Sequence, residues 1–232
     1  MDDKILWLSI LIGIILSSCQ DEVRLSCELV IDSSVTIEED KYFLESDNYD
    51  EPTIIITGNN FTIDFNGSTI IGDTNYQHPD LFTGLGIKVE NASNVTIKNL
   101  NIRGFKVGLL ADSIPGLTIE NCNFSYNYRP RMKSIRERED ISDWLSYHDN
   151  EEDEWLRFGA GIYLKNCDKV SISENRITQN QNALLMVGCN MGEVYNNVFS
   201  FNSGLGIGLY RATQNKIMHN CLDFNIRGYS HG

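Results

Sequence analysis

The chain has 232 residues, with 32 acidic against 19 basic side chains and a net charge of −13. This length fits one domain. Because so acidic a surface repels phosphate backbones, the composition excludes nucleic acid as an expected partner. It also gives no overall attraction to anionic uronate polymers, so local basic residues would have to bind them.

The first 19 residues are predicted to be a lipoprotein signal peptide. An apolar run from Ile5 to Leu16 is too short to span a bilayer comfortably. It ends in Leu16-Ser17-Ser18-Cys19, which resembles the bacterial lipobox, so Cys19 is the expected lipidation site. Two aspartates beside the single Lys4 are atypical of a signal peptide, and an ordinary N-terminal membrane anchor is the alternative. The expected location is the bacterial cell envelope, on the periplasmic side or at the cell surface.

Residues 20–52 are acidic and irregular and are interpreted as a linker or cap, with Leu25 to Ile37 as a first strand region. Residues 53–72 form an early unit with glycines at its bends. The main domain is expected to run from residue 53 to residue 232.

A twenty-residue unit then recurs along the chain. Its copies begin at Gly86, Gly108, Gly161, Ala183 and Gly206, with a spacing of 22 or 23 residues except where an insertion intervenes. Repeat positions 2, 4, 12 and 17 are mostly apolar, which gives three short bursts of period-2 alternation. A single burst lacks hydrogen-bond partners, but stacked units supply them. The pattern therefore predicts an all-β parallel β-helix with three short strands per coil of about 22 residues.

Asparagines recur in register at two turns of the unit. Position 15 holds Asn175, Asn197 and Asn220, and position 20 holds Asn127, Asn180, Asn202 and Asn225. Asparagine tolerates left-handed backbone at bends, and stacked amides can hydrogen-bond along the stack. We expect a structural asparagine ladder, the alternative being that asparagine is simply common in turns.

These repeats resemble the right-handed parallel β-helix proteins related to pectate lyases and to NosD-type periplasmic proteins, over residues 53–225. The resemblance implies the fold more than any activity, since such scaffolds serve lyases, hydrolases, epimerases and binding proteins. It also implies a ligand groove along the first sheet.

Stacking places Glu90, Asp112 and Lys165 in one outward column of that sheet. The two carboxylates could bind Ca²⁺, and the resemblance to lyases implies Lys165 or Arg211 as the base. The alternative is a solvated ladder of complementary charges. Neither the paired aspartates of a polygalacturonase nor an Asp-Pro-His run is present at this face.

The insertion at residues 128–160 is expected to overhang the first sheet, with a helix over residues 136–148 whose apolar face carries Ile141, Trp144 and Leu145. It supplies most of the nominated substrate-binding residues. Aromatic rings could stack on sugars, Arg129 and Arg131 could engage carboxylates, and His148 could act with Asp149 as acid and base. Alternatively, Trp144 and Trp155 anchor the insertion to the coils. The full nominated set is Arg129, Arg131, Trp144, Tyr147, His148, Trp155, Tyr163 and Tyr210.

The remaining thiols do not form a recognisable metal motif. Cys167 and Cys189 occupy position 7 of adjacent coils, close to disulfide range, although a reduced stacked pair is the favoured interpretation. Cys122 is expected to be buried filler. The last repeat stops without a recognisable cap, from which we expect a longer natural solenoid.

Three hypotheses for function follow. The first is a lipid-anchored protein that binds an envelope polysaccharide and could cleave it by calcium-assisted β-elimination. The second is a non-catalytic surface or adhesion solenoid. The third is a NosD-like accessory factor for a periplasmic metalloenzyme. The sequence leaves catalysis, the glycan and the oligomeric state open.

Overall fold

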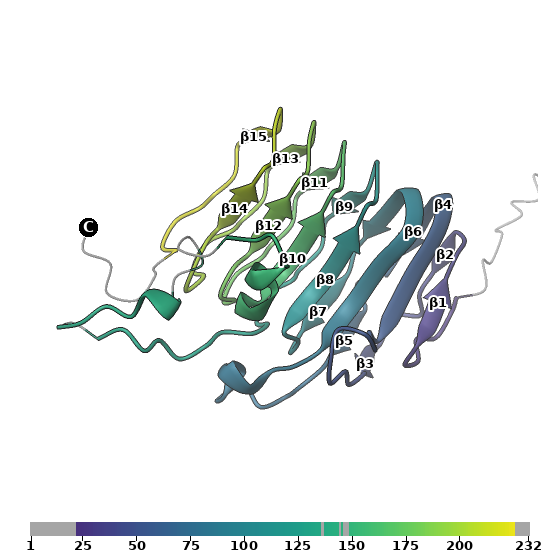
Figure 1. Ribbon diagram of the computed structural model, residues 1–232. Coiled ribbons are helices and arrows are strands. Elements are labelled where there is room, and N and C mark those ends of the chain that lie inside the picture. The colour runs from purple at the N-terminus through teal and green to yellow at the C-terminus, as the bar shows by residue number, and fades with distance from the viewer. Residues whose placement is uncertain (1–21, 136, 144, 146–148, 226–232) are drawn as a thin grey trace, which may run out of the picture.

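The computed structural model describes residues 22–135, 137–143, 145 and 149–225. Its strands are stacked in parallel as successive coils, from β1 at the N-terminal end to β15 at the other (Figure 1). Among the described residues, no helix is long and apolar enough to cross a membrane. The predicted signal peptide, with Cys19, lies outside the described residues.

The first face of the solenoid is made by the first apolar burst of each repeat. Leu109, Ile162, Leu184 and Ile207 follow one another in register, as the repeat predicts. The strands of this face are β1 (Leu29–Ile31), the first part of β4 (Ile54–Asp64), the first part of β6 (Leu85–Lys98), β8 (Val107–Asp112), β10 (Ala160–Lys165), β12 (Leu184–Val187) and β14 (Ile207–Tyr210).

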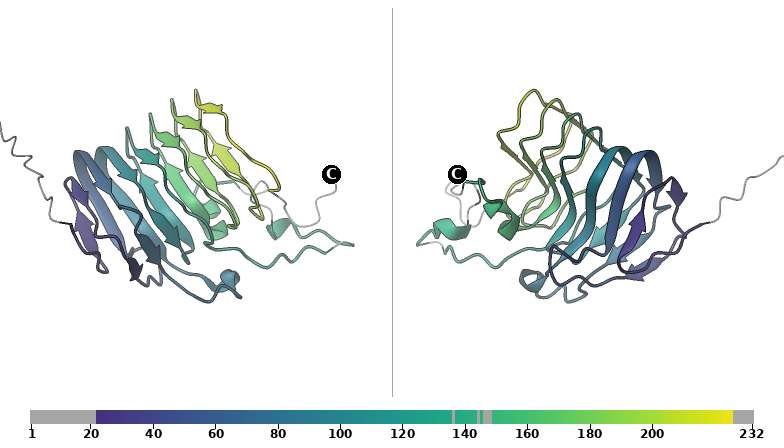
Figure 2. Two further views of the ribbon diagram at one scale, coloured as in Figure 1. Left: turned by 180° about the vertical axis from the view of Figure 1, so that it is seen from behind. Right: turned by 45° about the vertical axis from the view of Figure 1, so that its right-hand side comes forward.

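The second face is continuous with the first, because β4 and β6 bend from one into the other. Its remaining strands are β2 (Val35–Thr36), β9 (Thr118–Glu120), β11 (Ser171–Ser173), β13 (Glu193–Tyr195) and β15 (Lys216–Met218). A third face begins with β3 (Lys41–Phe43), β5 (Thr69–Ile71) and β7 (Asn101–Arg103). Single bridges from Asn123 through Arg176 and Val198 to Cys221 continue it, so every coil has three sides (Figure 2).

The inner core lies inside these coils. The four predicted inward residues of one coil, Ile162, Leu164, Ile172 and Ile177, are completely buried. Cys122, Cys167 and Cys189 are also buried there, and all three are free thiols in the structure. The parallel β-helix prediction is therefore confirmed.

Both asparagine ladders are present and span adjacent coils. The backbone N–H of Asn175 donates to Oδ1 of Asn197 at 2.9 Å, and that of Asn197 donates to Asn220 at 2.9 Å. The second ladder joins Asn127, Asn180, Asn202 and Asn225 in the same way, over 2.8 to 3.0 Å.

The ladder asparagines were expected to adopt left-handed backbone at the turns, and this expectation is wrong. The left-handed residues are their predecessors, such as Glu174 before Asn175 and Asn196 before Asn197. Each ladder asparagine instead faces inward, where its amide satisfies buried backbone groups that the turn leaves unpaired.

The solenoid also begins earlier than expected. Strand β1 pairs in parallel with β4, β2 pairs with the later part of β4, and β3 pairs with β5. Residues 29–43, interpreted as part of a linker or cap, thus form the first coil. Their strands are short and irregularly spaced, which hid the periodicity.

The insertion, residues 128–159, contains little regular structure in its described part. The 3₁₀ turns η2 (Ile141–Asp143) and η4 (Glu154–Phe158) lie in it, and η1 (Pro79–Leu81) lies in a separate loop. The predicted apolar helix face would bury both Ile141 and Leu145. In the structure Leu145 is buried, but Ile141 is 60% exposed. Trp144, Tyr147 and His148 lie outside the described residues.

Candidate functional site on the first face

A groove of about 520 Å³ lies on the outside of the first face. Its floor comes from β6, β8 and β10, and residues 153 and 156 of the insertion form one wall. The side chains that line it are mainly charged or amide-bearing, with a few apolar ones between them. They include Asn59, Lys88, Glu90, Asn91, Leu110, Asp112, Ser113, Asp153, Leu156, Tyr163 and Lys165.

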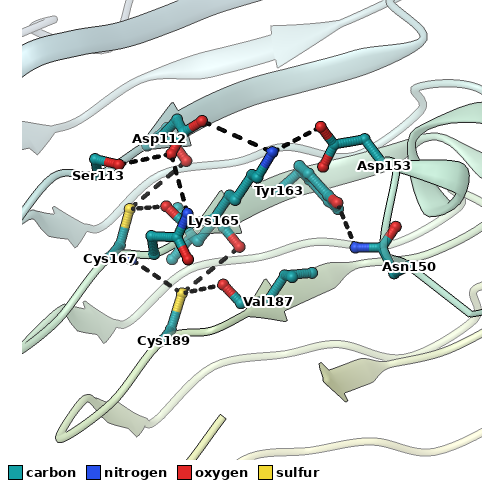
Figure 3. Close-up of polar contacts among 12 residues, drawn as sticks. Asp112, Ser113, Asn150, Asp153, Tyr163, Lys165, Cys167, Val187 and Cys189 are labelled. Atoms are coloured by element: carbon teal, nitrogen blue, oxygen red, sulfur yellow. Dashed lines mark hydrogen bonds and ion pairs between the residues drawn. The ribbon is translucent and has the colours of Figure 1, made fainter. Parts of the chain in front are cut away.

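Lys165 lies between two carboxylates at this groove (Figure 3). Its Nζ donates to Asp153 Oδ2 at 2.7 Å and lies 4.0 Å from Asp112 Oδ2. The hydrogen bond to Asp153 raises the pKa of Lys165 above that of a free lysine. Lys165 is therefore a fixed cation, whereas a proton-abstracting lysine needs a lowered pKa.

The other two residues of the predicted column, both acidic, also have partners of their own. Glu90 forms an ion pair with Lys88 at 2.9 Å, and Asp112 accepts a hydrogen bond from Ser113 at 2.8 Å. No group of three His, Cys, Asp or Glu side chains in the described part of the chain could hold a metal ion. The arrangement thus corresponds to the complementary-charge ladder more closely than to the Ca²⁺ site predicted for Glu90 and Asp112.

Trp155 of the insertion and Tyr163 of β10 are buried where the insertion covers the first face, with only 5% and 1% of their surfaces exposed. Asn150 Nδ2 donates to the Tyr163 hydroxyl at 3.0 Å (Figure 3). The Trp155 ring packs edge-on against Tyr210, with ring centroids 5.4 Å apart. Burial raises the pKa of Tyr163 to about 12. In this arrangement protein side chains already cover both rings, so neither presents an open face for the sugar stacking that the sequence predicts.

These rings belong to an outer cluster that is separate from the inner core. Its buried members are Leu85, Val107, Leu145, Trp155, Phe158, Ala160, Tyr163, Leu185 and Val187. The outer cluster fixes residues 149–158 over the first face, so the predicted overhang is observed. Trp155 is the anchor that the alternative interpretation described.

Tyr210 and Arg211 lie farther along the solenoid than Lys165. Both side chains bind Glu151 of the insertion. In register, Lys165 is followed by Val187 and then Tyr210, so Arg211 lies about two coil spacings, roughly 10 Å, from Lys165. The two predicted bases therefore do not share one reaction centre.

Arg129 and Arg131 lie outside the lining of this groove, at the start of the insertion. Arg129 donates to Gln179 Oε1 at 2.8 Å, and Arg131 lies 3.5 Å from Asp80. Lys88 and Asp153 were missed as site residues. Lys88 was detectable, because the repeat places it on the outer row of the same face. Asp153 gave no signal, because the periodicity does not extend into the insertion.

The comparison with known families adds one match. The family model described as periplasmic copper-binding protein (NosD), a family of parallel β-helix proteins, matches residues 13–231. No curated protein matches the chain. Because the match covers nearly the whole chain and the described fold has the same architecture, the chain belongs to the NosD family.

Proposed function

We propose that this NosD family member is a non-catalytic binding protein of the cell envelope that holds a segment of polysaccharide in the groove of its first face. The observation that carries the proposal is the set of fixed charges around Lys165, in an open groove lined by both donors and acceptors. Hydroxyl-rich ligands need donors and acceptors at close spacing, and Leu110 and Leu156 offer apolar contact to a sugar ring.

Binding is better supported than cleavage. The pKa of Lys165 is raised, so this side chain is protonated at neutral pH. Arg211 lies two coils from Lys165 and forms an ion pair with Glu151. A lyase with either residue as its base would first have to break these ion pairs. A preformed, mixed-charge groove needs no such rearrangement to bind a neutral or weakly charged glycan.

The envelope location is part of the proposal. The family description contains the word periplasmic, and the first 19 residues have the pattern of a lipoprotein signal peptide. Lipidation of Cys19 would anchor the solenoid at a membrane surface and place its groove toward envelope glycans.

The NosD-like accessory role is the second candidate, since the family description also names copper. Copper(I) favours thiolate and thioether ligands. In the described part of the chain, the pair that comes nearest to this preference is Cys167 and Cys189, stacked on adjacent coils (Figure 3). Both are completely buried, and their Sγ atoms lie 3.2 Å and 3.4 Å from the carbonyl oxygens of Lys165 and Val187.

This pair does not fit a copper site. The hydrogen bond with Cys189, together with burial, raises the pKa of Cys167 and disfavours its thiolate. The same hydrogen bond lowers the pKa of Cys189, so only one sulfur of the pair is suited to the thiolate form that a metal requires. No third donor of the described His, Cys, Asp or Glu side chains joins them. Support for the accessory role therefore comes from the family match.

The groove is tested by measuring glycan binding to purified protein, using a panel of neutral and uronate oligosaccharides. Lys165→Met with Asp153→Asn should weaken binding at least about tenfold, because both fixed charges are lost without adding bulk. Lys216→Met is the matched control, since its 2.8 Å pair with Glu193 lies on the second face. Unchanged affinity in the groove variant would refute the site.

Two further measurements separate the alternatives. Unsaturated products absorbing in the ultraviolet, formed by wild type and lost with Lys165→Met, would show a lyase. Copper co-purifying at one atom per chain and lost in Cys167→Ser would favour the accessory role instead.

A further inference from the structure

One edge of the solenoid carries large aromatic side chains where the backbone is left-handed. Each of the five repeats that begin at residues 86, 108, 161, 183 and 206 has four left-handed residues, at repeat positions 6, 9, 14 and 19. At position 19 the φ angles are 65° for Tyr126, 62° for Gln179, 62° for Phe201 and 57° for Phe224. We call these four residues the aromatic corner.

The fold does not require aromatic residues at this corner. Left-handed backbone is costly for bulky side chains and easy for glycine and asparagine. Gly104 occupies position 19 in the coil before that of Tyr126. The left-handed positions 6, 9 and 14 hold mostly asparagine, glycine and other polar residues. The rings add little to the core, because Tyr126, Phe201 and Phe224 are 54%, 47% and 66% exposed. Strain and exposed apolar surface together at one corner point to function.

The rings form a surface suited to a flat, partly apolar ligand. Phe201 and Phe224 are stacked, with centroids 5.1 Å apart and an interplanar angle of 13°. Next to them, Arg129 is held by its 2.8 Å hydrogen bond to Gln179. A hollow of about 360 Å³ lies among these side chains and Asn202.

The charge of this hollow contrasts with that of the chain. Among the described residues, its lining contains a guanidinium, two amides and two phenyl rings and no carboxylate, although the net charge of the chain is −13. A ligand that fits must offer an apolar ring face and an anionic group. A pyranose with a carboxylate does so, because its C–H face packs on aromatic rings while the carboxylate pairs with arginine.

We propose that the aromatic corner is a second binding site, for uronic acid residues of a glycan chain. The site lies at the corner that follows the third face, on different residues from the groove of the first face, and does not depend on that groove. Successive coils repeat the corner about every 4.8 Å, so an extended chain can contact several rings. The aromatic corner is only one side chain wide, which is too narrow for a stable protein–protein interface of about 1,000 Å².

The test uses Phe201→Asn with Phe224→Asn, measured by calorimetry against trigalacturonic acid and its carboxyl-reduced counterpart. Asparagine is well suited to left-handed backbone, so the variant should keep the thermal midpoint of the wild type to within a few degrees. It should lose at least about tenfold in affinity for the trimer. Arg129→Gln should remove only the preference for the acidic over the reduced trimer. Phe43→Ala is the matched control, because Phe43 is likewise an exposed phenylalanine, 65% exposed, but lies on β3, away from the aromatic corner.

The proposal is overturned if the double variant binds the acidic trimer as tightly as wild type. Binding that persists in this variant but disappears with Lys165→Met would assign the uronate to the groove instead. Sedimentation of the unliganded protein gives another decisive outcome: if wild type self-associates and the double variant is monomeric, the corner is a contact between two copies of this chain and the glycan assignment is wrong.

Discussion

The stacked coils and the insertion at residues 128–159 are held in place by different means. In the coils, each residue meets its counterpart one repeat away, as Ile162 meets Leu109 and Leu184. The insertion instead contacts residues that are distant in the sequence and bear no repeat relation to it. For example, the Tyr49 hydroxyl donates to the carbonyl oxygen of Leu156, in the insertion, at 3.0 Å. Repetition therefore specifies the coils, whereas the insertion depends on one outer cluster and a few polar contacts.

This difference should appear in stability. The inner core and the ladders connect every coil to the next, so damage there affects the whole stack. The outer cluster can open locally while the coils remain folded, because its loss leaves the strand hydrogen bonds intact. Three predictions test the comparison, beginning with the largest effect.

Asn197→Ala should destabilise the coils most. Asn197 is buried, its Oδ1 accepts from Asn175, and its Nδ2 donates to the carbonyl oxygen of Ile172 at 2.9 Å. Removal leaves buried groups unpaired, so we expect a loss of about 3 kcal/mol in the free energy of unfolding, measured by denaturant titration. Asn220→Ala, at a half-buried residue of the last described coil, is the matched control and should cost about 1 kcal/mol. Equal losses would show that the ladder does not act through burial.

Trp155→Ala should release the insertion while sparing the coils. Loss of a buried indole costs about 3–5 kcal/mol where the surroundings cannot relax. Local detachment should limit the loss in coil stability to about 1 kcal/mol and raise the rate of protease cleavage in the insertion at least about tenfold. Both are measured on one sample, by denaturant titration and limited proteolysis. A loss as large as that of Asn197→Ala would contradict the independence of the two regions.

Lys106→Met should not destabilise the protein but give a gain in stability that depends on pH. Lys106 lies at the junction of coil and insertion, with Nζ 3.0 Å from the centre of the Tyr128 ring. Burial lowers its pKa from 10.5 to about 7. The folded state therefore binds fewer protons than the unfolded state between about pH 7 and 10.5, and stability gains as pH rises through that window.

The variant removes this charge. It should be more stable than wild type at pH 6, where the buried ammonium is charged, and the advantage should shrink toward pH 10. The cation–π contact with Tyr128 offsets part of the gain. Thermal midpoints across this range measure the difference, with Lys41→Met at an exposed site as the control. A difference that stays constant with pH would show that the Lys106 pKa is not lowered.

The sequence alone was sufficient for the stacking of the coils. Period-2 bursts and in-register asparagines predicted the register, the buried column from Leu109 to Ile207, and both ladders, because in a solenoid the nearest neighbour in space is the next repeat. The same logic placed Asp112 and Lys165 side by side. It did not identify the first coil at residues 29–43, whose short strands lack the regular spacing.

Only the tertiary structure decided what the insertion does to the first face. It covered Trp155 and Tyr163 and brought Asp153 to Lys165. It also placed Arg129 against Gln179, beside the exposed rings of the aromatic corner. None of this follows from a repeat, since contacts between an aperiodic loop and a periodic wall depend on packing and charge across distant positions, and a local pattern carries no information about those.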